Sequence, residues 1–464
     1  EKYGPGSIAF YVSGQLLTED YYVVNKLSKG FLKVNNIDSN SRLCMSSAVM
    51  GYRRAFGVDA PPCSYEDLRH TDCVFIIGSN MAYCHPVVFI QLAEEKEKKG
   101  DVLKIIVADP RKTSTAGIAD IFIPLEPGTD VALLNSMAHV LIEHGLVDYE
   151  YVNSYTEGFD ALKECVRSYP PEKVSDICGI PADLIVESAL AFGRSRAAMT
   201  FWAMGLNQSS SGTDKNNALL NLSIMTGNIG KPGAGPFSLT GQANAMGGRE
   251  TGGLANILPG HRYMTNEKHR DEVAAIWGVE ELSPARGLTA VDIYDDIEKG
   301  TIKAVWIICT NPVVSLPNGS KVERALKKAD LVVVQDIFHP TDTSVYADIV
   351  LPAAGFSEKE GTMTNQERRI AYISKAVEPP GEALPDWQIF TMFARKIGLG
   401  EYFDYEKAED IFEEYKNLNR GRDVDISGVT YERLKSRGPV QWPCPETAHP
   451  GTPRLYTEGV FHTD

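Results

Sequence analysis

The sequence lacks the short motifs that identify several common kinds of site. Its eight cysteines are scattered, and no two of them form the CxxC or CxxxC pairs that bind iron–sulfur clusters or zinc. No GxGxxG follows a first strand and no GxxxxGK[ST] occurs, so an ordinary NAD or ATP site has little support. Scattered thiols in a chain of 464 residues are typical of a reducing compartment, and we expect a cytoplasmic protein.

The sequence also lacks long apolar runs and an excess of basic residues. No stretch of about 18 apolar residues occurs, so we expect no membrane span. The net charge is −15, whereas nucleic acids and anionic membranes attract basic surfaces, so we expect neither as a partner. The first fifteen residues have no basic segment followed by an apolar one, as a signal peptide would. They resemble the middle of a domain, and we expect the chain to begin inside a larger protein.

What the sequence does contain is an alternation of short apolar runs and amphipathic segments. Runs rich in Val and Ile, bounded by Gly, Pro or Asp, predict buried parallel strands at 73–78, 102–109, 121–125, 198–205, 304–309, 331–336 and 348–353. A 3.6-residue period predicts a helix over 130–145, and the charged segment 406–423 predicts a solvated surface helix. This alternation indicates an α/β fold with two groups of strands, separated by the glycine-rich segment 226–256. No internal repeat is apparent.

Short polar residues follow the predicted strands in both groups. Because open α/β sheets bind ligands at the carboxyl ends of their strands, these residues suit ribose hydroxyls, phosphate oxygens and guanine or pterin edges. Loops commonly contain such residues. Five such sites in two sheets nevertheless favour two nucleotide-like ligands, or one long ligand across two domains. The segments are 78–80, 109–111, 205–208, 310–312 and 335–336.

Longer motifs, in order along the chain, resemble one enzyme family. They are SRLCMSSAV, GSNMAYCHP, MGLNQ, TGNIGKPGAGP, NAMGGRETGGLANILPGHR, TNPVVSLPN and YADIVLPAAGFSEKEGTMTNQERR. These motifs resemble the bis(molybdopterin guanine dinucleotide) molybdenum oxidoreductases of the dimethyl-sulfoxide-reductase superfamily. Within it, the sequence is most similar to the central portion of bacterial assimilatory nitrate reductase catalytic subunits, with periplasmic nitrate reductases close by.

The resemblance implies an architecture. It implies two Rossmann-like parallel-sheet domains, one inserted in the other, each holding one pyranopterin guanine dinucleotide of the molybdenum cofactor. The expected domains are 1–43 plus 246–390, and 44–245 with the metal-ligand cysteine; 391–464 would be a helical segment leading toward a further domain. The family's N-terminal [4Fe–4S] domain and its C-terminal barrel have no counterpart in this sequence. We expect the cluster in a full-length protein, with no ligands for it in this chain.

The resemblance assigns catalytic roles to two residues. Cys44 aligns with the ligand to molybdenum, and a soft thiolate, with its pKa lowered at a helix start, suits that metal. A buried core thiol is the ordinary alternative. Met45 follows, as in nitrate reductases, whereas formate dehydrogenases of the superfamily have histidine there. Arg249 aligns with an arginine that orients nitrate, a surface salt bridge being its ordinary alternative.

Further residues are assigned to the cofactor, one position at a time. Five residues are basic enough to neutralise phosphates: Arg53, Arg54, Arg368, Arg369 and Lys359. Arg53 and Arg54 could instead be solvated, and we interpret His85 as structural. The residues expected to bind the cofactor are Gln15, Asn40, Gly78, Ser79, Asn80, Met81, Asp109, Arg111, Gly128, Thr129, Asp130, Met204, Gln208, Asn311, Gln335, Asp336, Lys359 and Asp386.

The implied activity is reduction of nitrate to nitrite by oxygen-atom transfer. Ferredoxin or a flavoprotein subunit would supply electrons. Formate oxidation on the same fold is one alternative. A non-catalytic structural relative, like the large subunit of respiratory complex I, is another, and molybdenum analysis would separate it from an enzyme.

Overall fold

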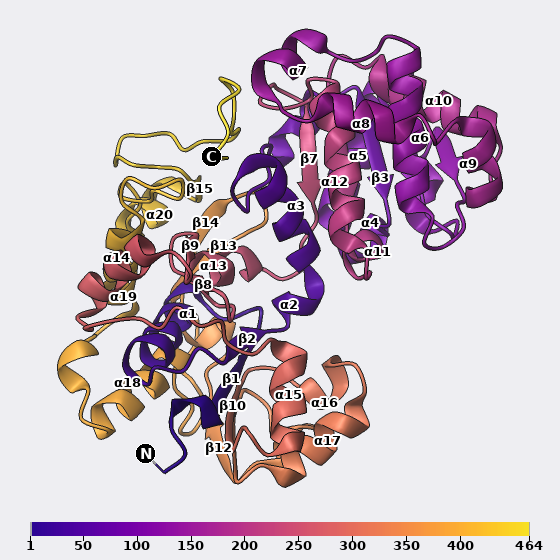
Figure 1. The fold of residues 1–464 in the computed structure, drawn as a ribbon. Helices are drawn as coiled ribbons and strands as arrows, with labels where there is room; N and C mark the ends of the chain where they lie inside the picture. The colour runs from indigo at the N-terminus through magenta and orange to yellow at the C-terminus, as the bar shows by residue number, and fades with distance from the viewer. Residues whose placement is uncertain (1, 464) are drawn as a thin grey trace. The chain divides into compact units, whose positions relative to one another are not determined.

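The computed structural model describes residues 2–463, which form two compact units. Unit 1 consists of Glu1–Leu43 and Gln242–Thr452, and unit 2 consists of Cys44–Gly241 and Pro453–Asp464. Each unit is built around a parallel sheet flanked by helices (Figure 1). Unit 1 is therefore discontinuous, and residues 391–452 are part of it.

The sheet of unit 1 has five parallel strands in the order β12-β11-β10-β1-β2. One face packs against α15 (Ala290–Lys299) and α17 (Gly319–Lys328), where Ile293 and Val322 meet Ile307 and Val334 in one apolar cluster. On the other face, Trp306 contacts the Phe390 ring of α18 (Asp386–Lys396) at 5.4 Å. The strands are β1 (Ile8–Val12), β2 (Ile37–Ser39), β10 (Ala304–Ile308), β11 (Leu331–Asp336) and β12 (Ile349–Pro352).

The sheet of unit 2 also has five parallel strands, in the order β5-β4-β3-β6-β7. Alternate residues of the strands, such as Val74 and Ile76, pack with Val88 and Leu92 of α5 (Pro86–Lys99). The opposite face meets α10 (Ala182–Gly193) and α12 (Gly212–Met225), and α6 (Asp130–Glu143) packs against both helices. The strands are β3 (Cys73–Ile77), β4 (Lys104–Ala108), β5 (Ile121–Ile123), β6 (Ala198–Trp202) and β7 (Gly235–Ser238).

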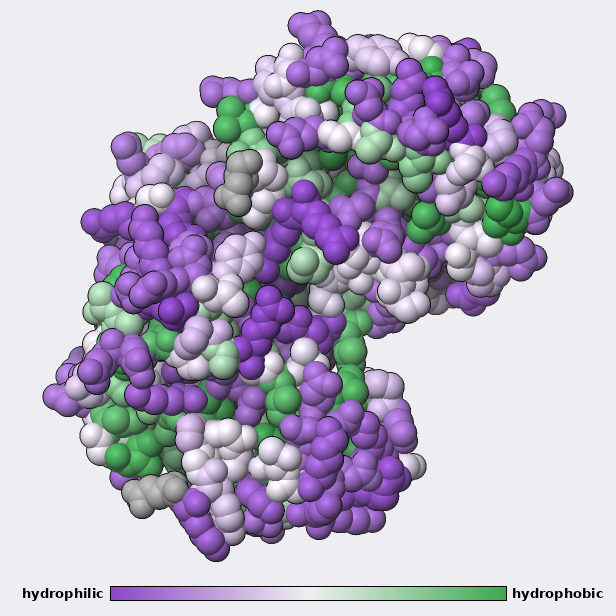
Figure 2. Space-filling view, in the orientation of Figure 1, coloured by the Kyte–Doolittle hydropathy of each residue, from purple (hydrophilic) through white to green (hydrophobic). Residues whose placement is uncertain are grey.

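The remaining elements lie around these sheets. Unit 1 contains α1 (Thr18–Asn25), α13 (Ala245–Glu250), α14 (Glu267–Trp277), α20 (Tyr431–Arg437) and a small antiparallel sheet of β13 (Gly361–Thr364), β14 (Arg369–Ile373) and β15 (Val440–Gln441). Unit 2 contains α3 (Ser46–Phe56), α7 (Tyr149–Tyr155), α8 (Phe159–Val166) and α9 (Pro171–Cys178). The face shown in Figure 2 is mainly hydrophilic, with hydrophobic residues in separate small areas. No helix within residues 2–463 combines the length and apolarity needed to cross a bilayer.

The elements predicted from the sequence are present, but strands β2 and β7 were not predicted and the surface helix needs a correction. All seven predicted strands and the helix over 130–145 are confirmed to within a few residues. The predicted surface helix is α19 (Ala408–Asn419), but it is not solvated all round. Ile411, Phe412 and Tyr415 are buried, and the Tyr415 ring lies 5.7 Å from that of Tyr22 in α1. The abundant charges of the segment had hidden this apolar face.

The two sheets repeat one plan that the sequence did not reveal. In each sheet, three strands that are consecutive in the sequence also lie side by side. They are β3, β4 and β5 in unit 2 and β10, β11 and β12 in unit 1. Asp120 and Asp348 immediately precede the equivalent strands β5 and β12, and their carboxylates accept from Ile105 N and Val332 N, each at 2.8 Å. The repeat is hard to detect in the sequence because the two units have few residues in common. One similar pair of segments is ADIFIPL in unit 2 and ADIVLPA in unit 1.

Candidate functional site

Most of the predicted ligand-binding residues lie at the carboxyl ends of the two parallel sheets. Parallel sheets bind ligands where the strand order reverses. That point lies between β1 and β10 in unit 1 and between β3 and β6 in unit 2. The loops after these four strands begin at Ser13, Cys309, Gly78 and Ala203.

In unit 2 the reversal point is formed by two glycines in direct contact. Gly78 has φ 58°, and its carbonyl accepts a hydrogen bond of 3.0 Å from Gly205 N. A Cβ on Gly205 would lie 2.6 Å from the Cα of Gly78, so neither loop has room for a side chain there. Next to them, the hydroxyl of Ser79 is buried and has no hydrogen-bond partner in the part of the chain that the structure describes. The site thus presents backbone atoms and one available hydroxyl to a ligand.

Two equivalent asparagines shape the loops after β3 and β10. Asn80 Oδ1 accepts from Thr115 Oγ1 at 3.0 Å, and Asn311 Oδ1 accepts from Thr343 Oγ1 at 2.6 Å. The same two hydroxyls accept from Ala82 N and from the corresponding amide in unit 1. These side chains therefore fix the starts of α4 (Met81–Cys84) and α16 (Pro312–Ser315). The sequence analysis did not identify Thr115 and Thr343, because they become apparent only when the two units are compared.

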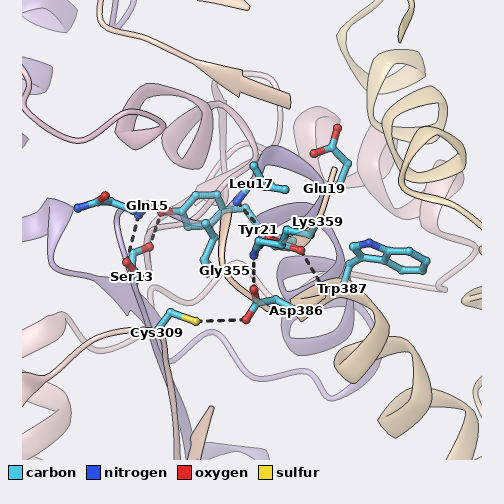
Figure 3. Close-up of polar contacts among 12 residues, drawn as sticks. Ser13, Gln15, Leu17, Glu19, Tyr21, Cys309, Gly355, Lys359, Asp386 and Trp387 are labelled. Atoms are coloured by element: carbon cyan, nitrogen blue, oxygen red, sulfur yellow. Dashed lines mark hydrogen bonds and ion pairs between the residues drawn. The ribbon is translucent and has the colours of Figure 1, made fainter. Parts of the chain in front are cut away.

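In unit 1 a buried polar cluster occupies the reversal point (Figure 3). Asp386 Oδ1 accepts from Gln335 Nε2 at 2.5 Å and from the Cys309 thiol at 3.3 Å. Lys359 Nζ donates to Asp386 and, at 2.8 Å, to Asp20. The structure thus brings together three residues predicted from the sequence, Gln335, Lys359 and Asp386, with two that were not, Asp20 and Cys309.

The charges of this cluster are balanced within the protein interior. Burial alone would lower the pKa of Lys359, but Asp20 and Asp386 raise it well above its usual value, so the ammonium stays charged. Burial, followed by the charge of Asp386, raises the pKa of the Cys309 thiol, which stays neutral. The buried Oε1 of Gln335 has no hydrogen-bond partner among residues 2–463, so it is available to accept from a ligand.

Unit 2 has a simpler counterpart of this cluster. Asp130 begins α6 as Asp386 begins α18, and its Oδ2 lies 2.6 Å from Lys215 Nζ of α12. Both side chains are buried. An aspartate at a helix start thus pairs with a buried lysine in each unit. Lys215 was not predicted, and only the comparison of the two units reveals it.

Cys44 lies at a break between two helices. It is the last residue of the one-turn helix α2 (Ser41–Cys44), and α3 begins at Ser46 after Met45, whose φ of −119° interrupts the helix. The expected position at a helix start is therefore wrong by two residues. The thiol is partly exposed, and its Sγ lies 3.7 Å from Met204 Sδ, another predicted ligand-binding residue. A buried core thiol, the ordinary alternative, does not fit this position.

Arg249 lies on the short helix α13 and is 6% exposed. Its Nη1 donates to Ala245 O at 3.2 Å. The neighbouring Gly248 packs on Tyr21, where an added Cβ would lie 2.8 Å from the ring. A solvated surface salt bridge is excluded by this burial, and the glycines allow the helix to pack this closely.

The other predicted residues differ in how they could meet a ligand. Asn40 Oδ1 is buried without a partner, next to Gly14, whose added Cβ would lie 2.8 Å from it. Arg368 is fully buried and donates to Trp442 O and Thr452 O, so it does not neutralise a phosphate. Burial raises the pKa of Asp336. The remaining predicted residues are more accessible and lie in the segments that follow the strands of their units: Gln15, Asp109, Arg111, Gly128, Thr129 and Gln208. Met81 is buried.

These observations fit a polar cofactor that brings its own metal ligands. Among the described residues, three predicted ones each have a buried oxygen without a hydrogen-bond partner at a strand end: Asn40, Ser79 and Gln335. Within residues 2–463, no group of three or more His, Cys, Asp or Glu side chains could hold a metal. A metal here would need ligand atoms from a cofactor in addition to a single thiolate, as dithiolene sulfurs would provide.

Comparisons with known proteins agree with this chemistry. A family model described as molybdopterin oxidoreductase matches residues 1–396. A nitrate reductase from Synechocystis sp. is 45% identical over 467 residues, covering 99% of this chain and 65% of the relative. The F420-dependent formate dehydrogenase subunit alpha of Methanocaldococcus jannaschii is 43% identical over 457 residues, 98% of this chain and 66% of the relative.

A solved structure has the same fold. The acetylene hydratase from Pelobacter acetylenicus superposes with a TM-score of 0.74 at 24% identity, over 94% of this chain and 60% of the hydratase. This chain thus spans less than two thirds of the length of these proteins.

Proposed function

The chain belongs to the molybdopterin oxidoreductase family, and from this premise we propose that it reduces nitrate to nitrite at a molybdenum bis(molybdopterin guanine dinucleotide) centre. The observation that carries the proposal is Cys44, a partly exposed thiol beside Met204 and followed by Met45. The 45% identity to a nitrate reductase supports nitrate as the substrate.

Each unit would hold one dinucleotide at the carboxyl end of its sheet. In unit 1 the proposed contacts are Gln15, Asn40, Asn311, Gln335, Asp336, Lys359 and Asp386. In unit 2 they are Gly78, Ser79, Asn80, Met81, Asp109, Arg111, Gly128, Thr129, Asp130, Met204 and Gln208. The unpartnered oxygens of Asn40, Ser79 and Gln335 support this assignment, because a buried oxygen without a partner is costly unless a ligand satisfies it.

The chain's own residues would place the substrate and the metal. When bound, the cofactor supplies the two-electron chemistry. Cys44 contributes one thiolate ligand. Arg249 binds nitrate through N–H donors arranged in a plane, and its burial strengthens that interaction. The overall reaction consumes two electrons and two protons and releases nitrite and water. We propose ferredoxin or a flavoprotein as donor, a [4Fe–4S] cluster outside this sequence as its route, and a cytoplasmic setting.

Formate oxidation is the second candidate, because a formate dehydrogenase subunit is 43% identical to this chain. Met45 argues against it, since the superfamily's formate dehydrogenases have histidine at this position. Turnover of nitrate and of formate by one preparation separates the two candidates.

The proposal is tested with Cys44→Ala and, as a matched control, Cys84→Ala, which removes an exposed cysteine. Nitrate reduction with reduced viologen should fall by about a thousandfold or more in Cys44→Ala and stay near wild type in the control. Wild-type turnover in Cys44→Ala contradicts the assigned role.

A further inference from the structure

Lys29 is a buried lysine that the proposed function does not use. It lies in the helical segment η2 (Lys26–Phe31) and is 1% exposed. Its Nζ donates to three backbone carbonyls, those of Gly252 at 2.5 Å, Leu254 at 2.9 Å and Ile257 at 2.9 Å. In the described part of the chain no carboxylate forms an ion pair with Lys29. The three carbonyl dipoles therefore replace most of the water that would otherwise solvate its ammonium group.

The three carbonyls belong to the turn 252–257, which follows the helix that carries Arg249. Gly252 N donates to Arg249 O at 3.1 Å, and Gly253 N donates to Gly248 O at 2.7 Å. The turn is therefore hydrogen-bonded to the last residues of α13. A shift of the turn would shift the backbone that carries the Arg249 side chain.

The same turn is held by residues next to Cys44 in the sequence. Asp38 Oδ1 accepts from Ala255 N at 3.2 Å, and Arg42 Nη2 donates to Asn256 Oδ1 at 2.8 Å. Arg42 also pairs with Asp38 at 3.0 Å, and it lies on α2, which ends at Cys44. The turn 252–257 thus supports both α13 and the end of α2.

We propose that Lys29 is a positioning residue that holds Arg249, through the turn 252–257, in the orientation that binds the anionic substrate. This inference rests on the role proposed above for Arg249. An ammonium has three N–H donors, which match three converging carbonyls. An apolar side chain would leave these buried carbonyls without their donor, at a cost to the turn.

The protonation of Lys29 adds a pH dependence to this role. Burial lowers the pKa of Lys29 to about 7, while Asp38 raises it and Arg42 lowers it further. The neutral amine has two N–H donors in place of three. An opened turn would expose Lys29 to water and restore its usual pKa, so the opened state binds the proton more tightly than the closed one. Despite the lost donor, the turn should therefore become harder to open as the pH rises above neutrality.

The test compares Lys29→Met with Lys26→Met in the cofactor-loaded enzyme. Lys26 lies one turn earlier, is 3% exposed, and bonds Tyr405 and Glu414 at 2.9 and 2.8 Å, away from the turn. Hydrogen exchange of the Gly252, Gly253 and Gly260 amides should accelerate about tenfold or more in Lys29→Met and not in Lys26→Met. The KM for nitrate should rise about tenfold with kcat changed less than threefold.

Three results would overturn the inference. In the first, the turn amides of Lys29→Met exchange at the wild-type rate. In the second, the amides of β1 and β10 accelerate equally, which indicates a general loss of stability. In the third, the turn opens but the KM for nitrate is unchanged. If Lys29→Met does not fold, Lys29→Arg, which keeps a cation with several donors, should protect the turn amides. If the wild type shows no nitrate turnover, the proposed function fails, and amide exchange alone still decides whether Lys29 holds the turn.

Discussion

Lys359 donates a hydrogen bond to Asp386 within the interior of unit 1, where their side chains are 4% and 0% exposed. Asp386 also accepts from the Cys309 thiol (Figure 3). Lys359 also pairs with Asp20, and Asp386 also accepts from Gln335. One ammonium thus holds two carboxyl groups that come from α1 and α18. This arrangement fixes Gln335 at the end of β11 before any ligand binds.

Replacing Lys359 by methionine should strongly destabilise unit 1. Two buried carboxyl groups would lose their cation, and removing one partner of a buried ion pair costs about 3–5 kcal/mol. Urea unfolding measures the change. Lys375→Met, which removes an exposed pair with Glu378, should cost less than about 1 kcal/mol. Equal effects of the two substitutions would show that the buried cluster does not contribute as described.

Gly205→Ala should damage the reversal point of unit 2. The added Cβ would lie 2.6 Å from Gly78 Cα, a backbone atom that cannot move aside cheaply. We expect a loss of about 1–3 kcal/mol in unfolding free energy and a reduced guanine nucleotide content. Gly117→Ala is the matched control, because nothing lies within 4 Å of its added Cβ. A Gly205→Ala protein with wild-type stability and nucleotide content would contradict the close approach of the two loops.

Stability should decrease as the pH rises from 5 to 8. Burial raises the pKa of Glu19 and of Glu250 from 4.5 to about 7. The folded state therefore holds these protons more tightly than the unfolded state does. The stability they contribute is fully present below pH 4.5 and is lost as the pH rises through 7.

Glu250→Gln tests this pH dependence directly. The amide keeps an oxygen acceptor for Trp442 Nε1, which donates to Glu250 at 2.6 Å, but it cannot ionise. The loss of unfolding free energy between pH 5 and pH 8 should shrink by about 2–3 kcal/mol in this variant. Glu281→Gln, at an exposed position, should leave the slope unchanged. An unchanged slope in Glu250→Gln would mean that Glu250 ionises normally in the folded protein.

The strands were predictable because their signal is local. Run 73–78 is apolar up to its final glycine, and run 331–336 is apolar through Val334. They become the central strand β3 and the near-central strand β11. The polar segments after them were located for the same reason. The apolar face of α19 was hidden by its charges, and the break at Met45 has no proline or glycine to mark it.

Pairings between distant residues could not be predicted from one sequence. Gln335 and Asp386 are 51 positions apart, and Lys359 and Asp20 are 339 apart, with no periodicity linking them. The burial of Arg368 depends on carbonyls of Trp442 and Thr452, which are equally remote. Asp130 and Lys215 pair in the same way. The resemblance selected several of these positions, but only the structure shows their partners.

We propose that Cys44 helps to hold a molybdenum cofactor whose dinucleotides bind at the two sheets. The most direct measurement is the molybdenum and guanine nucleotide content of the purified wild-type enzyme and of Cys44→Ala. We expect two guanine nucleotides per molybdenum in the wild type and a marked loss of molybdenum in the variant. A wild-type enzyme that reduces nitrate without molybdenum, or a Cys44→Ala enzyme that retains the metal and full turnover, would contradict it.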